Sequence, residues 1–236
     1  MNTTLVLNPK GGSGKTTIAL NLASYFASVR VTCTVMDYDP QGSSLNWLRV
    51  RPPHAARIHG VSGARPKGNR LRSMAMHVPA DSRQLIIDAP AGAAGTLLQE
   101  MIDRANCLIV PVTPSCIDLH ATFMFIQDVL QSPRIRSRNL PLAIVANKVR
   151  RSMPRYQPLD WFLETLGVTL TARLLDSDVF LRAVEDGRGI FEMPPSVSGA
   201  ECQQFLPLAE WVESQGSGRT PRPERNVYTI ARGVQR

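Results

Sequence analysis

Two lysines and a run of glycines near the start of the chain have the types and spacing of a phosphate-binding loop. The run reads, in order, Lys10, Gly11, Gly12, Ser13, Gly14, Lys15, Thr16 and Thr17. Glycines let backbone N–H groups turn inward around an anion, and a helix that begins there aims its positive dipole end at the same anion. Lys15 would contact the β- and γ-phosphates of a nucleotide, and the Thr16 hydroxyl would ligate Mg²⁺. A glycine-rich turn without a ligand is the alternative. The order of strand, loop and amphipathic helix favours phosphate binding.

Carboxylates follow two other apolar segments of the chain. Asp37 and Asp39 stand two positions apart at the end of one segment, so their side chains leave a strand in the same direction. Asp88 ends the second segment, where an aspartate would hold Mg²⁺ through water. The residues from Asp39 to Gly42 (Asp-Pro-Gln-Gly) are also good turn formers, so a purely structural turn stays open for this segment.

The alternation of apolar and amphipathic segments predicts an α/β fold. We expect strands at residues 4–8, 31–37, 84–88, 107–112, 142–146 and 169–175. We expect helices at residues 16–28, 97–104, 119–130, 159–166, 179–186 and 199–214. This order implies right-handed crossovers and a single doubly wound, mostly parallel sheet with helices on both faces. Ligands bind such sheets at the carboxyl ends of the strands, where the glycine loop and the carboxylates fall.

Composition divides the chain into one folded domain at residues 1–215 and a basic, flexible tail at residues 216–236, which is poor in apolar residues. Residues 49–72, rich in Arg, Pro and Gly, predict an irregular basic surface segment inside the domain. Neither a secretory signal nor an apolar run of about 20 residues is found, which predicts a soluble, intracellular protein. The four cysteines have no metal-binding or redox spacing.

The glycine loop departs from the ordinary GxxxxGK[ST] pattern, because Asn8 stands where the first glycine belongs and Lys10 opens the run. With that lysine the loop resembles the deviant Walker A signature of the ParA/MinD family of P-loop ATPases. It is most similar to the small ParA-type partition and positioning ATPases that lack an N-terminal helix-turn-helix domain. The segments VMDYDPQGSSLNW (35–47), LIIDAPAG (85–92) and LIVPVTPSCIDLHA (108–121) resemble further stretches of the family, and the resemblance covers roughly residues 3–195.

The resemblance implies a Mg²⁺-dependent ATPase that forms an ATP-dependent homodimer with two ATP molecules between its subunits. Lys10 matches the family's lysine that reaches the phosphates of the partner subunit's ATP. Asp39 matches the carboxylate that positions the attacking water and the Mg²⁺ shell, with Asp37 in a supporting role. Asp88 matches the Walker B metal ligand. Asn147 matches the residue that reads the adenine edge, although an Asn at a strand end is also a common turn former. Turnover is expected to be slow without a partner.

The formal net charge of +8 predicts a polyanionic partner. We expect two arginine-bearing loops to bind DNA without sequence preference, since arginine contacts to phosphates carry no sequence information. The candidates are Arg134, Arg136 and Arg138 in one loop and Arg150, Arg151 and Arg155 in the other. With the resemblance, this charge predicts a cytoplasmic, nucleoid-associated ATPase that positions or segregates a plasmid, chromosome or protein compartment. A cargo adaptor of ParB-like role would stimulate its hydrolysis. A generally basic surface without a DNA role is the alternative.

Three other functions share this fold. A DNA-site-binding accessory factor of the conjugation or border-binding type would recognise one sequence rather than depend on turnover. A MinD-like membrane-positioning ATPase would need a basic amphipathic helix, and the thin apolar content of the tail disfavours it. An ATP-dependent amide-forming enzyme or ligase would need a substrate domain, which the short chain does not offer.

Overall fold

The computed structural model describes residues 1–64, 76–152 and 157–216. Within these ranges the chain forms a seven-stranded sheet in the order β3-β2-β4-β1-β5-β6-β7, with every neighbouring pair parallel. The strands are β1 (Asn2–Val6), β2 (Cys33–Asp37), β3 (Ile58–Ser62), β4 (Gln84–Asp88), β5 (Cys107–Val112), β6 (Leu142–Val149) and β7 (Leu170–Leu175). The helices are α1 (Lys15–Ser28), α2 (Ser43–Val50), α4 (Gly95–Arg104), α5 (Cys116–Gln131), α6 (Pro133–Arg138), α7 (Gln157–Leu166), α8 (Asp178–Glu185), the short 3₁₀ helix η1 (Ile190–Glu192) and α9 (Pro195–Gly216).

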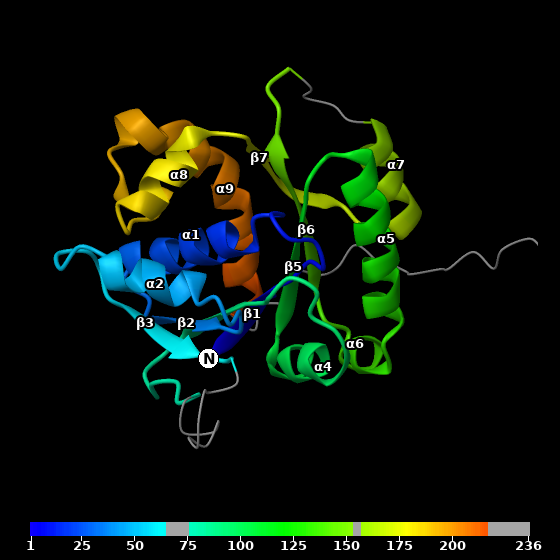
Figure 1. The fold of residues 1–236 in the computed structure, drawn as a ribbon, viewed down its shortest axis with the longest axis horizontal. Helices are drawn as coiled ribbons and strands as arrows, with labels where there is room; N and C mark the ends of the chain where they lie inside the picture. Colours follow the sequence, from blue (N-terminus) through cyan, green and yellow to red (C-terminus); the bar gives the residue numbers. More distant parts are fainter. Residues whose placement is uncertain (65–75, 153–156, 217–236) are drawn as a thin grey trace, which may run out of the picture.

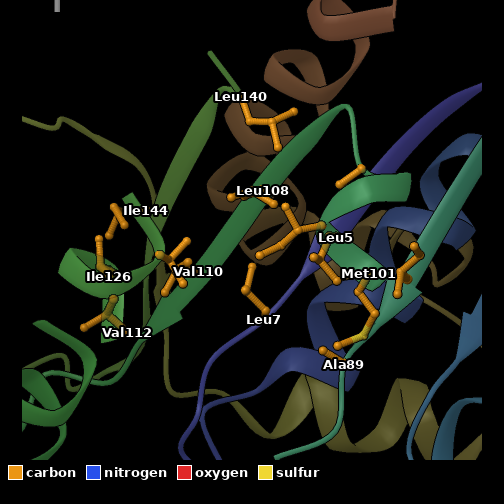
Figure 2. Packing of buried hydrophobic residues seen from close by; sticks show 14 of the residues in the cluster. Leu5, Leu7, Ala89, Met101, Leu108, Val110, Val112, Ile126, Leu140 and Ile144 are labelled. Carbon is orange, nitrogen blue, oxygen red and sulfur yellow. The ribbon is translucent and has the colours of Figure 1, made fainter. Parts of the chain in front are cut away.

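Helices cover both faces of the sheet, with α1, α2, α8 and α9 on one side and α4, α5, α6 and α7 on the other (Figure 1). Consecutive strand residues alternate between the two layers, as the period of a β-strand requires. Val6 belongs to the apolar cluster that includes Phe205 of α9, whereas Leu5 belongs to the cluster that includes Met101 of α4 (Figure 2). Burial on both faces explains why the strands are almost continuously apolar. The expected doubly wound parallel sheet is therefore confirmed.

The expected strands and helices are present, and their ends differ from the predictions by a few residues. The predictions for 84–88 and 107–112 coincide with β4 and β5, while β1 lies two residues before the predicted 4–8. The last helix, predicted at 199–214, runs from Pro195 to Gly216. The predicted tail beyond it lies outside the described residues. Over the residues that the structure describes, no helix has the length and hydropathy needed to cross a bilayer.

The prediction of an irregular segment at 49–72 is wrong at residues 49–50 and 58–62, while residues 51–57 and 63–64 are irregular as expected. Helix α2 continues to Val50, and β3 pairs with β2 at the edge of the sheet. The middle of β3 is Gly60, and a Cβ there would lie 2.6 Å from Leu48 Cδ1 of α2. A larger residue here would therefore make the leucine side chains of α2 shift, and glycine weakens the sequence signal of a strand. Residues 65–72 lie outside the described part of the chain.

Two predicted loops are regular structure instead. Residues 133–138 form helix α6, which has Pro133 in its first turn and ends at Asn139 in the left-handed conformation with φ 46°. Strand β6 extends past the predicted residue 146 to Val149, so that Asn147 lies within the strand. Helix α6 has six residues, three of them arginines or prolines in its first four positions, and such short polar helices leave little apolar periodicity to read.

Candidate nucleotide-binding site

The loop between β1 and α1 has the backbone of an anion-binding turn. Gly12 and Gly14 have φ values of 75° and 92°, in the left-handed region where glycine alone is unstrained. Gly14 is the N-cap of α1, and no side chain accepts a hydrogen bond there. The first turn of α1 also contains no acidic residue, so its N–H groups and dipole remain available for an anion. Thr16 and Thr17 lie half-buried in that first turn.

Asn8, the residue that replaces the usual first glycine, fastens the loop to the sheet. Its side chain is 3% exposed, and its Nδ2 donates to the Pro111 carbonyl at 2.7 Å and to Thr122 Oγ1 at 3.3 Å. Its Oδ1 accepts from the Lys10 N–H at 2.8 Å. The sequence pattern marks Asn8 only as a departure, whereas the structure gives it the role of an anchor from the loop to β5 and α5.

The two lysines of the loop have different surroundings. Lys15 is 7% exposed, and its Nζ donates to the Lys10 carbonyl at 3.0 Å. Burial lowers the pKa of Lys15, while the nearby carboxylates of Asp88 and Asp39 act to raise it. Lys10 has an exposed side chain at the surface of the loop. A buried lysine beside a helix N-terminus and an exposed lysine on the same loop suit phosphate contacts within and between subunits, respectively.

Asp37 and Asp88 are register partners on the neighbouring strands β2 and β4, and both carboxylates are buried. Asp37 accepts from the backbone N–H groups of Asp39 at 2.9 Å, Ser44 at 2.9 Å and Leu45 at 3.3 Å. Burial raises the pKa of Asp37, and these three hydrogen bonds act to lower it. Asp37 therefore caps α2 and holds the loop that precedes it.

Asp39 lies at the start of this loop and is partly exposed. Its Oδ1 accepts from the Gln41 N–H at 2.9 Å, and its carbonyl accepts from the Gly42 N–H at 2.9 Å. The turn allowed for in the sequence is therefore formed. It leaves the Asp39 carboxylate close enough to Lys15 to influence the lysine's pKa.

Asp88 is joined to the same loop by Ser44, which the sequence analysis did not single out. The fully buried Ser44 hydroxyl donates to Asp88 Oδ2 at 2.7 Å. Burial raises the pKa of Asp88 to about 6, while hydrogen bonding from Ser44 and Thr16 and the charge of Lys15 act to lower it. In the sequence, Ser44 was marked only as the second serine after the run Asp37–Gly42. Its contact with Asp88 could not be predicted from that, because the two residues are 44 positions apart.

The residues around Asp88 fit Mg²⁺. Asp88 Oδ1 is buried without a hydrogen-bond partner, and the Thr16 hydroxyl lies beside the same carboxyl group. Hard oxygen ligands of this kind suit Mg²⁺, which keeps several waters and needs only one or two protein ligands besides the phosphates of a nucleotide. Among the described residues, no group of three or more His, Cys, Asp or Glu side chains could hold a metal ion.

Asn147 lies at the carboxyl end of β6 against the phosphate loop. Its side chain is 6% exposed, and its Nδ2 donates to the Ser13 carbonyl at 2.8 Å. The turn-forming alternative is wrong, because the chain continues as a strand to Val149. The structure brings Asn147 to the site that the sequence predicted and adds a contact to the loop itself.

The arginines predicted to bind DNA divide into two groups. Arg134 pairs with Asp103, and Arg138 donates to the carbonyls of Ile102, Asp103 and Ala105 at the end of α4. Both lie on helix α6 rather than in a loop, and both are used to join α6 to α4. The side chains of Arg136, Arg150 and Arg151 are exposed. Arg155 lies outside the described residues.

Comparisons with known proteins agree with this geometry. The family model described as the CobQ/CobB/MinD/ParA nucleotide binding domain matches residues 4–190. A curated relative, the maintenance of carboxysome distribution protein A of Halothiobacillus neapolitanus, is 25% identical over 204 residues, which are 81% of this chain and 87% of the relative. An ATP complex of a variant McdA from Cyanothece superposes with a TM-score of 0.66 at 15% identity, over 91% of this chain and 96% of that chain. The Mg-ADP complex of the septum site-determining protein MinD of Pyrococcus horikoshii gives 0.67 at 16% identity, over 92% and 97%.

Proposed function

Because the chain belongs to the CobQ/CobB/MinD/ParA family of nucleotide-binding domains, we propose that it is a Mg²⁺-dependent ATPase of ParA type that positions or segregates a cargo. The family match confirms the resemblance found in the sequence. One observation carries the proposal: at the N-terminus of α1, buried Lys15 lies close enough to Asp88 for the two charges to interact, and Asp88 Oδ1 has no hydrogen-bond partner. A relative named for carboxysome distribution supports a positioning role.

The described residues divide the work of ATP hydrolysis among them. Lys15 and the N–H groups from Gly11 to Thr17 would bind the phosphates. Thr16 and Asp88 would hold Mg²⁺, which offsets the negative charge of the β- and γ-phosphates when it is bound with ATP. Asp39, partly exposed beside Lys15, would orient the attacking water, while Asp37 holds the Asp39 loop in place.

The remaining polar capacity of the Asn147 amide would read the adenine edge. One of its N–H groups donates to Ser13, which leaves a second N–H group and Oδ1 to pair with a purine.

The exposed Lys10 would act across an ATP-dependent homodimer. Its place on the outer side of the loop supports a contact with a nucleotide held by the partner subunit, where its charge would stabilise the transferring phosphoryl group. A hydrolysis step that needs two subunits is slow by itself, and a cargo adaptor of ParB-like role would stimulate it. Dimer and monomer would then be the two states of a positioning cycle.

Non-specific DNA would be the surface over which the cargo moves, which makes the protein nucleoid-associated. The net charge of +8 and the exposed side chains of Arg136, Arg150 and Arg151 support this proposal. Arg134 and Arg138 support it less, because their guanidinium groups bind α4. The DNA-site-binding accessory factor and the membrane-positioning ATPase stay as alternatives.

The test of nucleotide chemistry is a measurement of ATP binding and phosphate release, with Mg²⁺ and with a chelator. We expect slow hydrolysis that needs Mg²⁺, and a loss of ATP affinity on the order of 10–100-fold in Lys15→Gln, since the variant loses charge-assisted hydrogen bonds to phosphate. Arg83→Gln, which changes an exposed basic side chain just before β4, is the matched control and should bind as the parent does. Unchanged ATP affinity in Lys15→Gln would contradict the proposed site.

The test of the positioning cycle is binding to random-sequence DNA at one fixed salt concentration, with ATP, with ADP and without nucleotide. Binding with ATP alone supports the cycle, and replacing Arg136, Arg150 and Arg151 by Gln should then flatten its salt dependence. Equal binding in all three states would separate DNA from the nucleotide switch. Saturable binding to one DNA sequence over random DNA would favour the accessory factor. ATP-dependent binding to liposomes would favour the membrane-positioning ATPase.

A further inference from the structure

Strand β6 is irregular at the point where Asn147 leaves it. The register between β6 and β7 shifts between Ala146 and Val149, and Lys148 has a φ of 56°. A non-glycine residue in this left-handed region is strained by about 1–2 kcal/mol and persists only where its surroundings require it. Irregularities of this kind redirect a side chain out of the regular pleat. Here the side chain beside the strained residue is the buried amide of Asn147.

The Asn147 amide enters a hydrogen-bond network inside the phosphate loop. Asn147 Nδ2 donates to the Ser13 carbonyl at 2.8 Å, across 134 residues of sequence. Ser13 is 3% exposed, and its hydroxyl donates to the Lys10 carbonyl at 3.2 Å. The same carbonyl accepts from Lys15 Nζ at 3.0 Å. The network therefore runs from β6 through Ser13 to Lys15, the lysine that would contact phosphate.

Glycine at position 14 allows both the left-handed backbone and the close approach of the Asn147 side chain. A Cβ on Gly14 would lie 2.0 Å from Asn147 Nδ2, closer than any two such atoms approach. The Ser13–Gly14 peptide is trans, because the chain contains no cis peptide bond among the described residues. In a trans peptide the carbonyl and the following N–H point in opposite directions. Holding the Ser13 carbonyl toward Asn147 therefore turns the Gly14 N–H away from Asn147.

We propose that Asn147 is a positioning residue for the phosphate loop: through the Ser13 carbonyl it fixes the Ser13–Gly14 peptide with its N–H preset for a phosphate. This role is additional to base recognition and rests on the proposed nucleotide site. With this role, Asn147 at the end of β6 would act on both the phosphates and the base of a nucleotide. Loss of the amide should weaken binding of the phosphates whatever base is attached to them.

The test compares dissociation constants for ATP, GTP and inorganic tripolyphosphate, each with Mg²⁺, in the parent and in Asn147→Leu. We expect about tenfold weaker binding of GTP and tripolyphosphate, as for one lost hydrogen bond in a buried network, and a larger loss for ATP, which also loses the proposed contact to adenine. Asn147→Asp keeps the shape but replaces the donor with a carboxylate, so all three affinities should fall further, because the new charge also repels the phosphates.

A different pattern would overturn the proposal. Weaker ATP binding with unchanged tripolyphosphate and GTP binding would show that Asn147 acts on the base alone. Unchanged affinity for all three ligands would show that the contact to Ser13 has no effect. A parent protein that binds none of the three would instead contradict the proposed nucleotide site, so the two failures are distinguishable.

Two controls separate positioning from general loss of structure. Asn106→Leu removes an amide hydrogen bond to the Thr3 N–H at the amino end of β1, and it should leave all three affinities unchanged. Lys148→Gly relieves the left-handed backbone and should keep the affinities. Lys148→Val opposes that backbone conformation and should weaken all three ligands, although it leaves the Asn147 side chain in place. Unfolding midpoints without ligand show whether each variant is folded.

Discussion

Asp37 and Asp39 are two positions apart, yet their surroundings give them different tasks. Asp37 is 1% exposed and accepts three backbone N–H groups, two of which begin α2. Asp39 is partly exposed and accepts one N–H group within its own turn. The first carboxylate therefore stabilises the loop, and the second is available to a ligand.

Substitution by alanine should separate these two tasks. Asp37→Ala leaves three N–H groups without an acceptor, and we expect its free energy of unfolding to fall by about 2–4 kcal/mol. Asp39→Ala should change that free energy by less than about 1 kcal/mol and keep ATP binding, but stop hydrolysis. Denaturant unfolding and single-turnover phosphate release measure the two effects. Normal hydrolysis by Asp39→Ala would show that another group positions the water.

Asp88 shows how a residue suited to a metal can weaken the protein without one. Its pKa is raised from 3.8 to about 6, chiefly by burial, so the folded chain binds this proton more tightly than the unfolded chain does. The stabilising contribution of the protonated form is complete below pH 3.8 and is lost as the pH rises through about 6. At neutral pH the ionised carboxylate therefore costs stability until a cation binds.

We expect Asp88→Asn to be more stable than the parent at about pH 8 in a chelator, by about 3 kcal/mol, since a carboxyl pKa raised from 3.8 to about 6 corresponds to that free energy. At about pH 4 the two proteins should differ little, because the parent carboxyl is then largely protonated. Denaturant unfolding at both pH values measures the difference. An equal difference at both would rule out ionisation of Asp88 as its cause.

At the scale of elements, α2 is held at both ends. Asp37 and Ser44 tie its N-terminus to the ends of β2 and β4. Just beyond its C-terminus, Arg51 forms a buried ion pair with Glu192 of η1, with exposed fractions of 6% and 11%. The Arg51 guanidinium also lies 5.0 Å from the ring centre of Trp47. Helix α2 therefore links the carboxyl ends of β2 and β4 to the η1 corner.

Breaking the ion pair on one side should cost more than replacing both partners. Arg51→Ala leaves Glu192 buried without its cation, and we expect a loss of about 3–5 kcal/mol in the free energy of unfolding. The double variant Arg51→Met/Glu192→Gln removes both charges and keeps an acceptor for the Gly189 N–H, so it should lose clearly less. A double variant less stable than Arg51→Ala would contradict this account of the pair.

The elements that the sequence did not predict have local causes. The strand β3 contains His59 and Gly60, and only two of its residues are buried, so its apolar pattern is short. The arginines of α6 hide its helical pattern in the sequence. Two of them bind α4, and the spacing of residues within α6 cannot indicate that contact. By contrast, β4 and β5 are buried from end to end, with an apolar run Leu85–Ile87 in β4 and an apolar β5, and both could be placed to the residue.

Across the whole molecule, the sequence predicted which loops meet and could not predict how their side chains bond. The glycine loop, Asp37, Asp88 and Asn147 each follow a predicted strand, and a parallel sheet gathers those ends at one edge. The contacts of Asn8 with Pro111 and of Ser44 with Asp88 depend on strand order and register, which local propensity does not encode. The sequence therefore indicated where the candidate site lies, and only the three-dimensional structure shows the hydrogen bonds that hold its side chains.

The central position of β1 has a consequence for biosynthesis. The strand pairs with β4 on one side and β5 on the other, and its loop is braced by Pro111 and Asn147. The loop is thus translated early, but its braces emerge from the ribosome 103 and 134 residues later. Contacts of such long sequence separation close slowly and together. We therefore expect nucleotide binding to stabilise the finished sheet rather than the partial forms that precede the synthesis of β6.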